Sequence, residues 1–549
     1  MEATKITRTA PGLCRKICAG LGTVLLFTFV LSTFQAQAMR LETGNPDVDI
    51  RFDNSLTYSA VARVQDQNEE LLEDPNTDDA ERNFDKGLVM NRLDLLSELD
   101  LVYKKFGVRF SGTAYYDDVY NSENDHDSPA TANHDSTEYN EFTDETEKYH
   151  GKNAELLDAF TWGAVDMGAS TFRYKAGQFG QMWGKAFFPP FGANSIAGAL
   201  APLNIGYAAT VPNVELKKVI MPVPQATAGI QITDNLEIGA IYQFQWEPNR
   251  LFAAGSYFSP VDMVGPLGAE RILAGPIAFD RTHDVEARDD GQGGIQMTYT
   301  TPFGIELGLY ALRVHSRDFY VVTGLETPPG APPGVFAPSY YYYLYPEDVE
   351  YYGASIDTNV GVYPLSVEVT YRRNAPLASE DLHVFGPESV KIDNDDDPPY
   401  PVGQTVHVDI TSFSPANAGR LFCDEYDVIF EIGIDHLLEV DKNEEMVPED
   451  LKDTAVMAQI MYTAKWHQVL SGLDLHMPMS VTYSPEGRAA GMQSGSYGNH
   501  EGGSWNIGIQ AIYNSQWKAG LTYTDYFGKT ENQHSVDRDT IGFFITRTF

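Results

Sequence analysis

The stretch Thr171-Phe-Arg-Tyr-Lys-Ala-Gly-Gln178 guides the interpretation of the whole chain, because its apolar and charged residues alternate one by one. In a β-strand its aromatic residues would face one side, and Arg173 and Lys175 the other. A second alternating stretch, Leu236 to Trp246, follows a long apolar passage that Pro and Gly interrupt. This passage, residues 181–226, is too irregular to cross lipid and too apolar for a solvated loop. We therefore predict that it folds into the mouth or lumen of a β-barrel.

The same alternation recurs along the rest of the chain. Examples are the stretches Ile50 to Val64, Leu93 to Tyr103, Val428 to Ile434 and Trp505 to Tyr513. They occur in pairs joined by short turns and separated by long polar loops, as expected for the two ends of a membrane barrel. A soluble β-sandwich or propeller is the alternative, but a sandwich has no reason to alternate short and long connections. Aromatic residues also stand near strand ends, as in membrane-interface girdles. The sequence therefore predicts an all-β fold, a transmembrane antiparallel β-barrel of about 18 strands over residues 39–549.

The first 38 residues have the pattern of a cleaved signal peptide. Basic residues precede an apolar run from Leu21 to Leu31, and Ala36-Gln37-Ala38 forms a small-residue cleavage site. An uncleaved anchor is the alternative. The whole chain has a formal net charge of −39, which would repel nucleic acid. With a barrel to follow, the expected location is the outer membrane of a Gram-negative bacterium.

The C-terminal stretch Ile541-Gly-Phe-Phe-Ile-Thr-Arg-Thr-Phe549 resembles the assembly signal of outer-membrane proteins. In that signal a terminal aromatic residue follows alternating apolar residues. Arg547 departs from it, since an apolar residue is usual there. The resemblance implies recognition by the barrel-assembly machinery.

Two loops rich in carboxylates are candidate cation sites. The loop from Asp117 to Glu147 has no Lys or Arg, and Asp393-Asn-Asp-Asp-Asp397 is similar to part of a calcium loop. Pro398 stands where such a loop needs Gly, so Asp393, Asp395 and Asp397 are weak ligand candidates for Ca²⁺ or Mg²⁺, and a solvated acidic loop is the simpler interpretation. Bound cations would connect these loops to lipopolysaccharide. The sequence predicts no other cofactor.

Several spaced motifs resemble one protein family. They are Gln178 to Gly184, Val211 to Pro224, Thr233 to Glu237, Tyr242 to Pro248 and Gly255 to Ser259. Together they are similar to the domain-of-unknown-function 1302 family of proteobacterial outer-membrane barrels. Genes of this family often lie near a lipoprotein-sorting-like protein and a resistance-nodulation-division (RND) exporter. The resemblance therefore implies transport of apolar or lipid-like compounds, with those two proteins as partners.

The leading hypothesis is an outer-membrane channel that passes small molecules and is narrowed by residues 181–226. Candidate residues for the channel lining and the constriction are Arg173, Lys175, Trp183, Lys185, Phe187, Phe188, Glu215, Lys217, Lys218 and Glu237. Further candidates for the lumen lining are Arg51, Asp53, Glu98, Arg109, Glu306, Glu368, Arg372, Glu431 and Lys518. For each of them a structural ion pair in the lumen is the alternative role.

Two other functions remain open from the sequence. A plugged barrel would serve as an envelope anchor or adhesin through its acidic loops. A barrel lipase would use His476 and Ser480, which share one strand face with Thr482, but no Asp or Asn is placed by the sequence to orient the His. We therefore predict no catalytic residues and no enzyme.

Overall fold

The computed structural model describes residues 39–188, 194–263, 267–275, 277–385, 393–414, 422–493 and 500–549. The predicted signal peptide, residues 1–38, lies outside this part of the chain.

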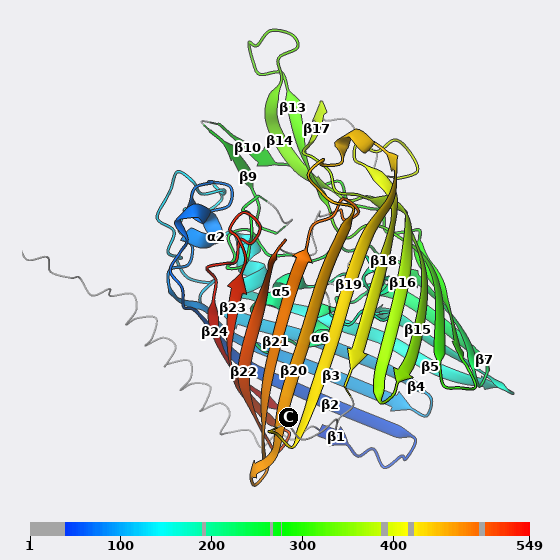
Figure 1. Cartoon of the computed structure of the whole chain (residues 1–549). Helices are drawn as coiled ribbons and strands as arrows, with labels where there is room; N and C mark the ends of the chain where they lie inside the picture. Colours follow the sequence, from blue (N-terminus) through cyan, green and yellow to red (C-terminus); the bar gives the residue numbers. More distant parts are fainter. Residues whose placement is uncertain are drawn as a thin grey trace, which may run out of the picture.

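Eighteen antiparallel strands form a closed barrel, as the alternation predicted (Figure 1). In order around the wall they are β2 (Val48–Arg63), β3 (Gly87–Tyr103), β4 (Phe106–Asp117), β5 (Lys152–Met167), β6 (Ser170–Phe179), β7 (Val223–Thr233), β8 (Leu236–Gln243), β11 (Gln292–Thr300), β12 (Glu306–Val314), β15 (Val349–Val360), β16 (Tyr363–Pro376), β18 (Val402–Phe413), β19 (Glu425–Lys442), β20 (Thr454–Leu470), β21 (Leu473–Glu486), β22 (Gly502–Tyr513), β23 (Trp517–Phe527) and β24 (Thr540–Thr548). β24 pairs with β2 from Thr548 opposite Ser55 to Thr540 opposite Arg63, which closes the wall. The short β1 (Met39–Leu41) pairs with β2 beside this seam.

The two ends of the barrel differ in their connections. One end, called here the short-turn end, carries tight turns such as the β15–β16 turn, where Gly361 has a φ of +68° that favours glycine. The C-terminus lies at this end (Figure 1). The opposite end, the long-loop end, carries long connections, among them β2–β3, β4–β5, β6–β7 and β8–β11. This asymmetry is the one that the sequence predicted.

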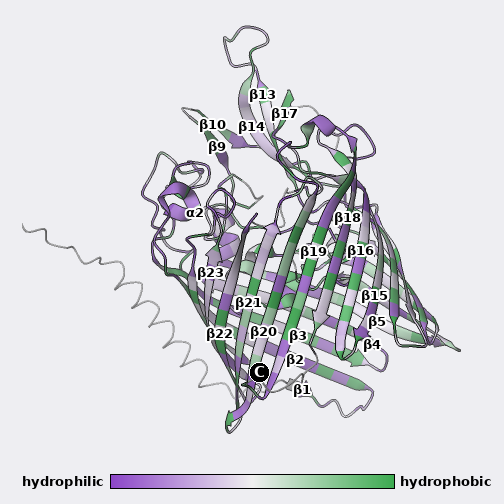
Figure 2. Ribbon diagram, viewed as in Figure 1, coloured by the Kyte–Doolittle hydropathy of each residue, from purple (hydrophilic) through white to green (hydrophobic). Residues whose placement is uncertain are grey.

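The outer face of the wall is an apolar band bordered by aromatic residues. Exposed aliphatic side chains such as Leu309, Ile507 and Leu521 alternate with inward polar ones (Figure 2). Exposed tyrosines stand near both strand ends: Tyr103, Tyr363 and Tyr513 at the short-turn end, and Tyr116, Tyr242, Tyr352 and Tyr483 at the long-loop end. A nine-residue strand such as β12, rising about 3.3 Å per residue at a tilt of ~40°, spans roughly 23 Å, close to the ~25 Å apolar band of outer-membrane barrels.

A second sheet of five strands stands on the long-loop end (Figure 1). Its order is β17 (Leu382–Phe385), β13 (Tyr320–Glu326), β14 (Ala337–Leu344), β10 (Ile277–Arg281) and β9 (Arg271–Ala274). Tyr341 and Tyr343 of β14 are fully buried, and they pack on the rings of Phe279 and Phe319, respectively. The sequence did not predict this sheet, because its strands come from three different loops.

Helices are few and short. They are α2 (Asp79–Arg82), α3 (Asp144–Thr146), α4 (Ile196–Leu200), α5 (Ile205–Thr210) and α6 (Leu216–Val219), the 3₁₀ turns η1 (Glu69–Leu72) and η4 (Glu444–Met446), and the π turn η2 (Glu147–Gly151). Within the described residues, no helix is long and apolar enough to span a bilayer.

Candidate functional site

The β6–β7 connection, Gly180 to Pro222, enters the barrel and is called here the in-folded segment. Figure 1 shows α5 and α6 inside the wall. The predicted range of residues 181–226 is slightly too long, because Val223 to Ala226 already pair with β6. Ser195 caps α4 by accepting the N–H groups of its first turn, and Asn204 caps α5. Residues 189–193 lie outside the described residues.

One side of the lumen wall binds the segment through Glu368 of β16. Its carboxylate is buried and accepts the backbone N–H groups of Lys185 (2.8 Å) and Ile196 (3.0 Å). The Lys185 ammonium in turn lies 3.0 Å from Glu306 and 2.5 Å from Asp357, on the neighbouring strands β12 and β15. Hydrogen bonds to charged groups are the strong ones. Backbone and side chain of Lys185 are therefore both fixed to the wall.

Glu431 of β19 makes a second attachment on the same side. Its two oxygens accept the consecutive N–H groups of Phe187 (2.6 Å) and Phe188 (2.7 Å). The ring of Phe187 packs edge-on against both Phe188 and the wall residue Phe413, with ring centroids 4.9 and 5.3 Å away. The two phenylalanines are thus part of the attachment as well as of the predicted constriction.

The opposite side of the wall binds the far half of the segment through β3. Lys217 forms an ion pair with Glu98, and the buried Lys218 lies 3.6 Å from Asp94. Both lysines belong to the short helix α6. Glu215 is half-buried at the N-cap position of this helix.

The seam of the barrel makes a further contact with this half. Lys518 of β23 donates a hydrogen bond of 2.9 Å to the side-chain carbonyl of Asn213. Pro212 packs on Gly542 of β24, where a Cβ atom would lie only 3.0 Å from the proline ring. Because attachments exist on β12, β15, β16 and β19 and also on β3, β23 and β24, the in-folded segment crosses the lumen.

The in-folded segment is also held by two clusters of apolar side chains. The predicted residue Trp183 is buried in a cluster with Ile196 and Leu200 of the segment and Tyr310 and Tyr351 of the wall. A second cluster joins the segment residues Tyr207, Val211 and Val219 to aromatic residues of the loops at the long-loop end.

Helix α5 separates two cavities on the long-loop side of the lumen. The larger, of about 540 Å³, is lined by the α5 residues Ile205, Ala208 and Ala209 and by wall and loop residues that include Arg317 and Arg372. The smaller, of about 210 Å³, is lined by Gly206, Tyr207 and Thr210 and by the charged residues Arg92, Asp94, Glu155, Lys218 and Arg250. These charges are paired: Arg92 and Lys218 with Asp94, and Arg250 with Glu155. One face of α5 is thus mainly apolar and the other is polar.

Three predicted channel residues lie on β6 and β8, away from these attachments. Arg173 lies 3.3 Å from Glu237, near the short-turn end, and both side chains are about half exposed. Lys175 lies over the rings of Phe160 and Phe179, within 4.0 Å of each centroid. None of these contacts involves the in-folded segment, so these residues belong to the wall below it.

The remaining lining candidates are also on the wall. Arg51 pairs in register with Asp100 and Asp53 with Glu98, so they share the inward face that carries Glu98. Arg109 is 2.6 Å from Glu98. Ion pairs in this part of the lumen therefore join Arg109 of β4 to Glu98 and Asp100 of β3.

The acidic run from Asp393 to Asp397 does not gather into a ligand set. Asp393 closes a turn by accepting the N–H of Asp395, and Asp395 and Asp397 are exposed. Within the described residues the carboxylates that do converge are Asp78, Asp79 and Asp262. No local sequence pattern indicates this group, because Asp262 comes from a different loop than Asp78 and Asp79.

The residues considered for a lipase, His476 and Ser480, stand on one strand. They are four residues apart, about 13 Å at the rise of a strand, and Ser480 accepts a hydrogen bond of 2.6 Å from Asn506. That separation is far beyond the reach of a direct Ser–His hydrogen bond.

A protein family matches nearly the whole chain. Its description is "Protein of unknown function (DUF1302)", and the match covers residues 19–549. The chain belongs to this family. No curated protein matches it.

Solved structures of bacterial outer-membrane proteins are similar to this DUF1302 barrel at very low identity. OccAB4 of Acinetobacter baumannii has 10% identity and a TM-score of 0.39, with 91% of this chain and 98% of that chain covered. OpdK of Pseudomonas aeruginosa, solved with vanillate, has 9% identity and a TM-score of 0.38, with 91% and 98% covered. The outer membrane channel DcaP of A. baumannii has 8% identity and a TM-score of 0.37, with 94% and 100% covered.

Several site residues of this DUF1302 member were missed in the sequence. Asp435 accepts a hydrogen bond of 2.8 Å from Asn194 of the in-folded segment and lies 3.2 Å from His407. Asp409 and Thr411 continue the inward face of β18. His407, Asp409 and Thr411 alternate with Val and Ile, so the period of two that located the strand also marks them as lumen residues.

Proposed function

We propose that this protein is an outer-membrane channel for small molecules and that the in-folded segment is its constriction. The observation that carries the proposal is the attachment of one segment to opposite sides of the lumen, by Glu368 and Glu431 on one side and Lys217 and Lys218 on the other. A segment fixed in this way narrows the passage without being part of the wall. Its buried contacts keep it there when solutes pass.

The apolar outer face of the barrel supports a location in the outer membrane. An apolar band between two rows of tyrosines fits a bilayer, and short turns face the periplasm in outer-membrane barrels. The long-loop end would then face outward. Barrel-assembly machinery and lipopolysaccharide are the partners that this placement requires, and the periplasmic lipoprotein-sorting-like protein and the RND exporter remain proposals from the family resemblance.

The larger cavity supports a substrate with an apolar body and a negative group. Its lining combines Ile205, Ala208 and Leu251 with two buried arginines, Arg317 and Arg372. The hydrogen bonds of these arginines go to carbonyl and amide oxygens. The one carboxylate among the described residues of the lining, Asp318, accepts a hydrogen bond from Asn249, so two guanidinium groups accompany one carboxylate. A carboxylate or phosphate is the group that a guanidinium binds best. An amphiphilic anion therefore fits this cavity.

The constriction is tested by conductance. Replacing Phe187 to Asn213 with a short Gly/Ser bridge should raise the single-channel conductance in planar bilayers several-fold, because it removes α4, α5 and the attachments to Glu431. The matched control shortens the β13–β14 hairpin tip, residues 328–336, which lies outside the barrel. Heat-modifiable mobility shows that both variants assemble.

The conductance of the parent and of the deletion variant distinguishes a constricted channel from a plugged barrel. Equal conductance of the deletion and the parent would place the segment outside the path and refute the constriction. A parent that is silent at all voltages, with a deletion that conducts, would favour the plugged barrel acting as anchor or adhesin.

The substrate class is tested by current block. Octanoate added from the long-loop side should reduce the channel current, and Arg372→Gln should weaken the block at least ten-fold. Arg373→Gln is the matched control, because Arg373 is the adjacent residue but points to the exposed outer side and pairs with Glu350. Equal block in all three proteins would refute the role of the larger cavity while leaving the constriction untouched.

A further inference from the structure

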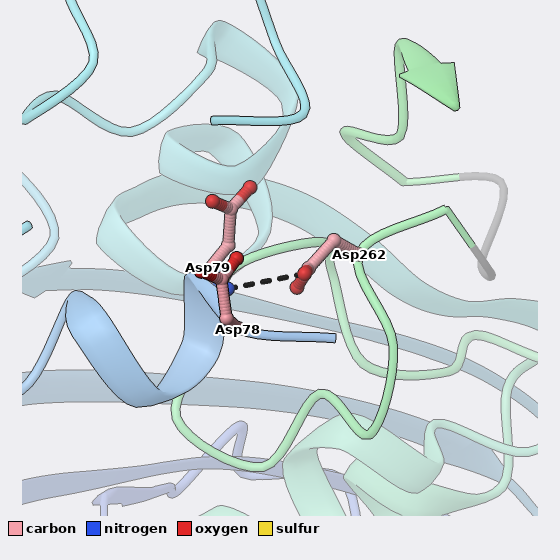
Figure 3. Close-up of side chains that lie close together, drawn as sticks. All are labelled: Asp78, Asp79 and Asp262. Carbon is pink, nitrogen blue, oxygen red and sulfur yellow. Dashed lines mark hydrogen bonds between the residues drawn. The ribbon is translucent and has the colours of Figure 1, made fainter. Parts of the chain in front are cut away.

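Three buried carboxylates meet at the long-loop end of the barrel. Asp78 and Asp79 stand at the start of α2 in the β2–β3 loop, and Asp262 comes from the β8–β9 connection. One oxygen of each lies within 4.8 Å of the others, and all three residues are almost fully buried. Figure 3 shows the Asp262 carboxylate directed at the backbone N–H of Asp79, at the start of α2.

Protein hydrogen bonds leave some of the oxygens here without a donor. Asp262 accepts the N–H of Asp79 (3.0 Å) with Oδ2, whereas its Oδ1 is buried and has no hydrogen-bond donor among the described groups. The same holds for the side-chain carbonyl oxygens of Asn83 and Asn133. Buried polar atoms are nearly always satisfied in proteins, so several such oxygens together point to a ligand.

These oxygens border a common space. A cavity of about 10 Å³ is lined by Asp79, Asn83, Asn133 and Asp262. That volume corresponds to about one water-sized particle. The pocket has room for a single small ion and for nothing larger.

The electrostatics of the cluster favour a cation. Asp78 pairs with Arg82, whereas Asp79 meets His126 at 2.9 Å and the N–H of Asn133 at 3.1 Å. Three carboxylates held close together away from water repel one another, which is energetically costly. Further positive charge would lower this cost.

We propose that Asp79, Asp262 and the side-chain carbonyls of Asn83 and Asn133, which line this cavity, bind one Ca²⁺ ion, and that Asp78, whose carboxylate lies within 4.8 Å of the other two, completes the site. All donors are oxygens, as hard cations require. Ca²⁺ takes six to eight oxygens in a flexible arrangement, whereas Mg²⁺ keeps several waters, for which this cavity has no room.

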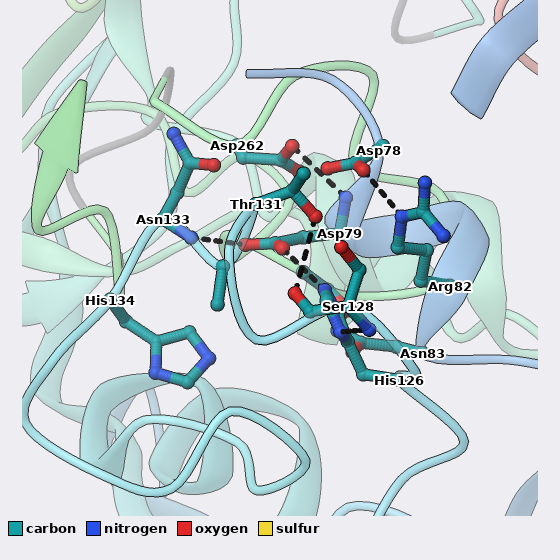
Figure 4. A network of polar contacts seen from close by, with 12 residues as sticks. Asp78, Asp79, Arg82, Asn83, His126, Ser128, Thr131, Asn133, His134 and Asp262 are labelled. Carbon is teal, nitrogen blue, oxygen red and sulfur yellow. Dashed lines mark hydrogen bonds and ion pairs between the residues drawn. The ribbon is translucent and has the colours of Figure 1, made fainter. Parts of the chain in front are cut away.

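The ion would connect three loops. Asp78 and Asp79 belong to the β2–β3 loop, Asp262 to the β8–β9 connection, and Asn133 to the β4–β5 loop (Figure 4). The same three loops supply Phe84, Phe142 and Tyr257 to the apolar cluster that packs on Tyr207 of α5. Bound Ca²⁺ therefore holds together the loops that rest on the in-folded segment.

Calcium binding is measured on the full chain in detergent after removal of metals with EGTA. Titration calorimetry with CaCl₂ should show one site, with a Kd at or below the ~10⁻³ M of extracellular calcium modules. Asp262→Asn should weaken binding at least 100-fold, and Asp78→Asn should weaken it as well. Asp395→Asn is the control, because Asp395 is an exposed carboxylate of another long loop.

Limited proteolysis gives a second readout that does not depend on transport. Ca²⁺ should slow cleavage of the β2–β3, β4–β5 and β8–β9 loops in the parent and have no such effect in Asp262→Asn. Heat-modifiable mobility shows that each variant has a folded barrel. No binding at about 10 mM Ca²⁺, equal binding in Asp262→Asn, or equal affinity for Mg²⁺ would overturn the assignment.

Discussion

Replacing Glu368 with Gln should loosen the in-folded segment while leaving the barrel intact. The two oxygens of Glu368 accept the N–H groups of Lys185 and Ile196 at 2.8 and 3.0 Å. Gln has the same shape but only one acceptor oxygen. In Glu368→Gln one of these N–H groups therefore faces an NH₂ group and loses its bond.

The free energy by which Glu368→Gln destabilises the attached segment follows from the lost hydrogen bond and from the buried N–H group that is left without a partner. A hydrogen bond to a charged group contributes about 1.5–3 kcal/mol, and a buried N–H without a partner costs about 1–3 kcal/mol. Together they destabilise the attached segment by roughly 2.5–6 kcal/mol. At about 1.4 kcal/mol per factor of ten, the population of the detached segment should rise roughly 10²- to 10⁴-fold. The wall keeps its stability, because its ladder hydrogen bonds do not involve this side chain.

Hydrogen exchange of the full chain in detergent, followed by mass spectrometry, measures this population. Peptides that contain Lys185 and Ile196 should lose protection in Glu368→Gln, and β16 should not. Glu237→Gln is the matched control, because Glu237 is a lumen carboxylate that pairs with Arg173 and not with the segment. Unchanged protection of residues 181–200 in Glu368→Gln, or the same loss in Glu237→Gln, would refute the attachment.

Two further predictions concern the far half of the segment and the C-terminus. The double change Lys217→Gln and Lys218→Gln should shift the reversal potential in a KCl gradient toward cations. At ~8 Å in water each charge contributes about 0.5 kcal/mol, and the two together about 1 kcal/mol. The permeability ratio should therefore rise roughly five-fold, and an unchanged ratio would exclude both lysines from the path. Deleting Phe549 should reduce assembled barrel in the outer membrane, because Phe549 also exchanges two backbone hydrogen bonds, of 2.8 and 2.9 Å, with Asn54 across the seam. Normal amounts of heat-modifiable barrel would contradict this role.

Some of the residues that attach the in-folded segment to the wall could be predicted from the sequence. Lys185, Lys217 and Lys218 were expected near the path, and they do contact wall carboxylates. Arg173 and Glu237 were grouped with them, yet they pair with each other below the segment. The period of two places a side chain on the inward face but does not give its height, which depends on strand tilt and stagger.

The proposed cation site could not be predicted from the sequence. The run from Asp393 to Asp397 resembles a calcium loop because its carboxylates lie close together in the sequence, yet Asp395 and Asp397 are exposed in a turn. Asp79 and Asp262 are 183 residues apart and are buried together. A ligand set assembled from separate loops leaves no local pattern.

The sequence by itself determined the wall: its all-β class, its strand number near 18 and the presence of an apolar segment that needs shelter. These are local properties, because lipid on one side and a polar lumen on the other impose alternation on every strand separately. Only the tertiary structure decided which wall residues hold the segment. The N–H groups of Lys185, Phe187 and Phe188 that Glu368 and Glu431 bind belong to the backbone, which is the same for nearly every residue and so carries no sequence signal. Their partners are fixed by the closing of the barrel, which brings distant strands and one folded loop to the same place.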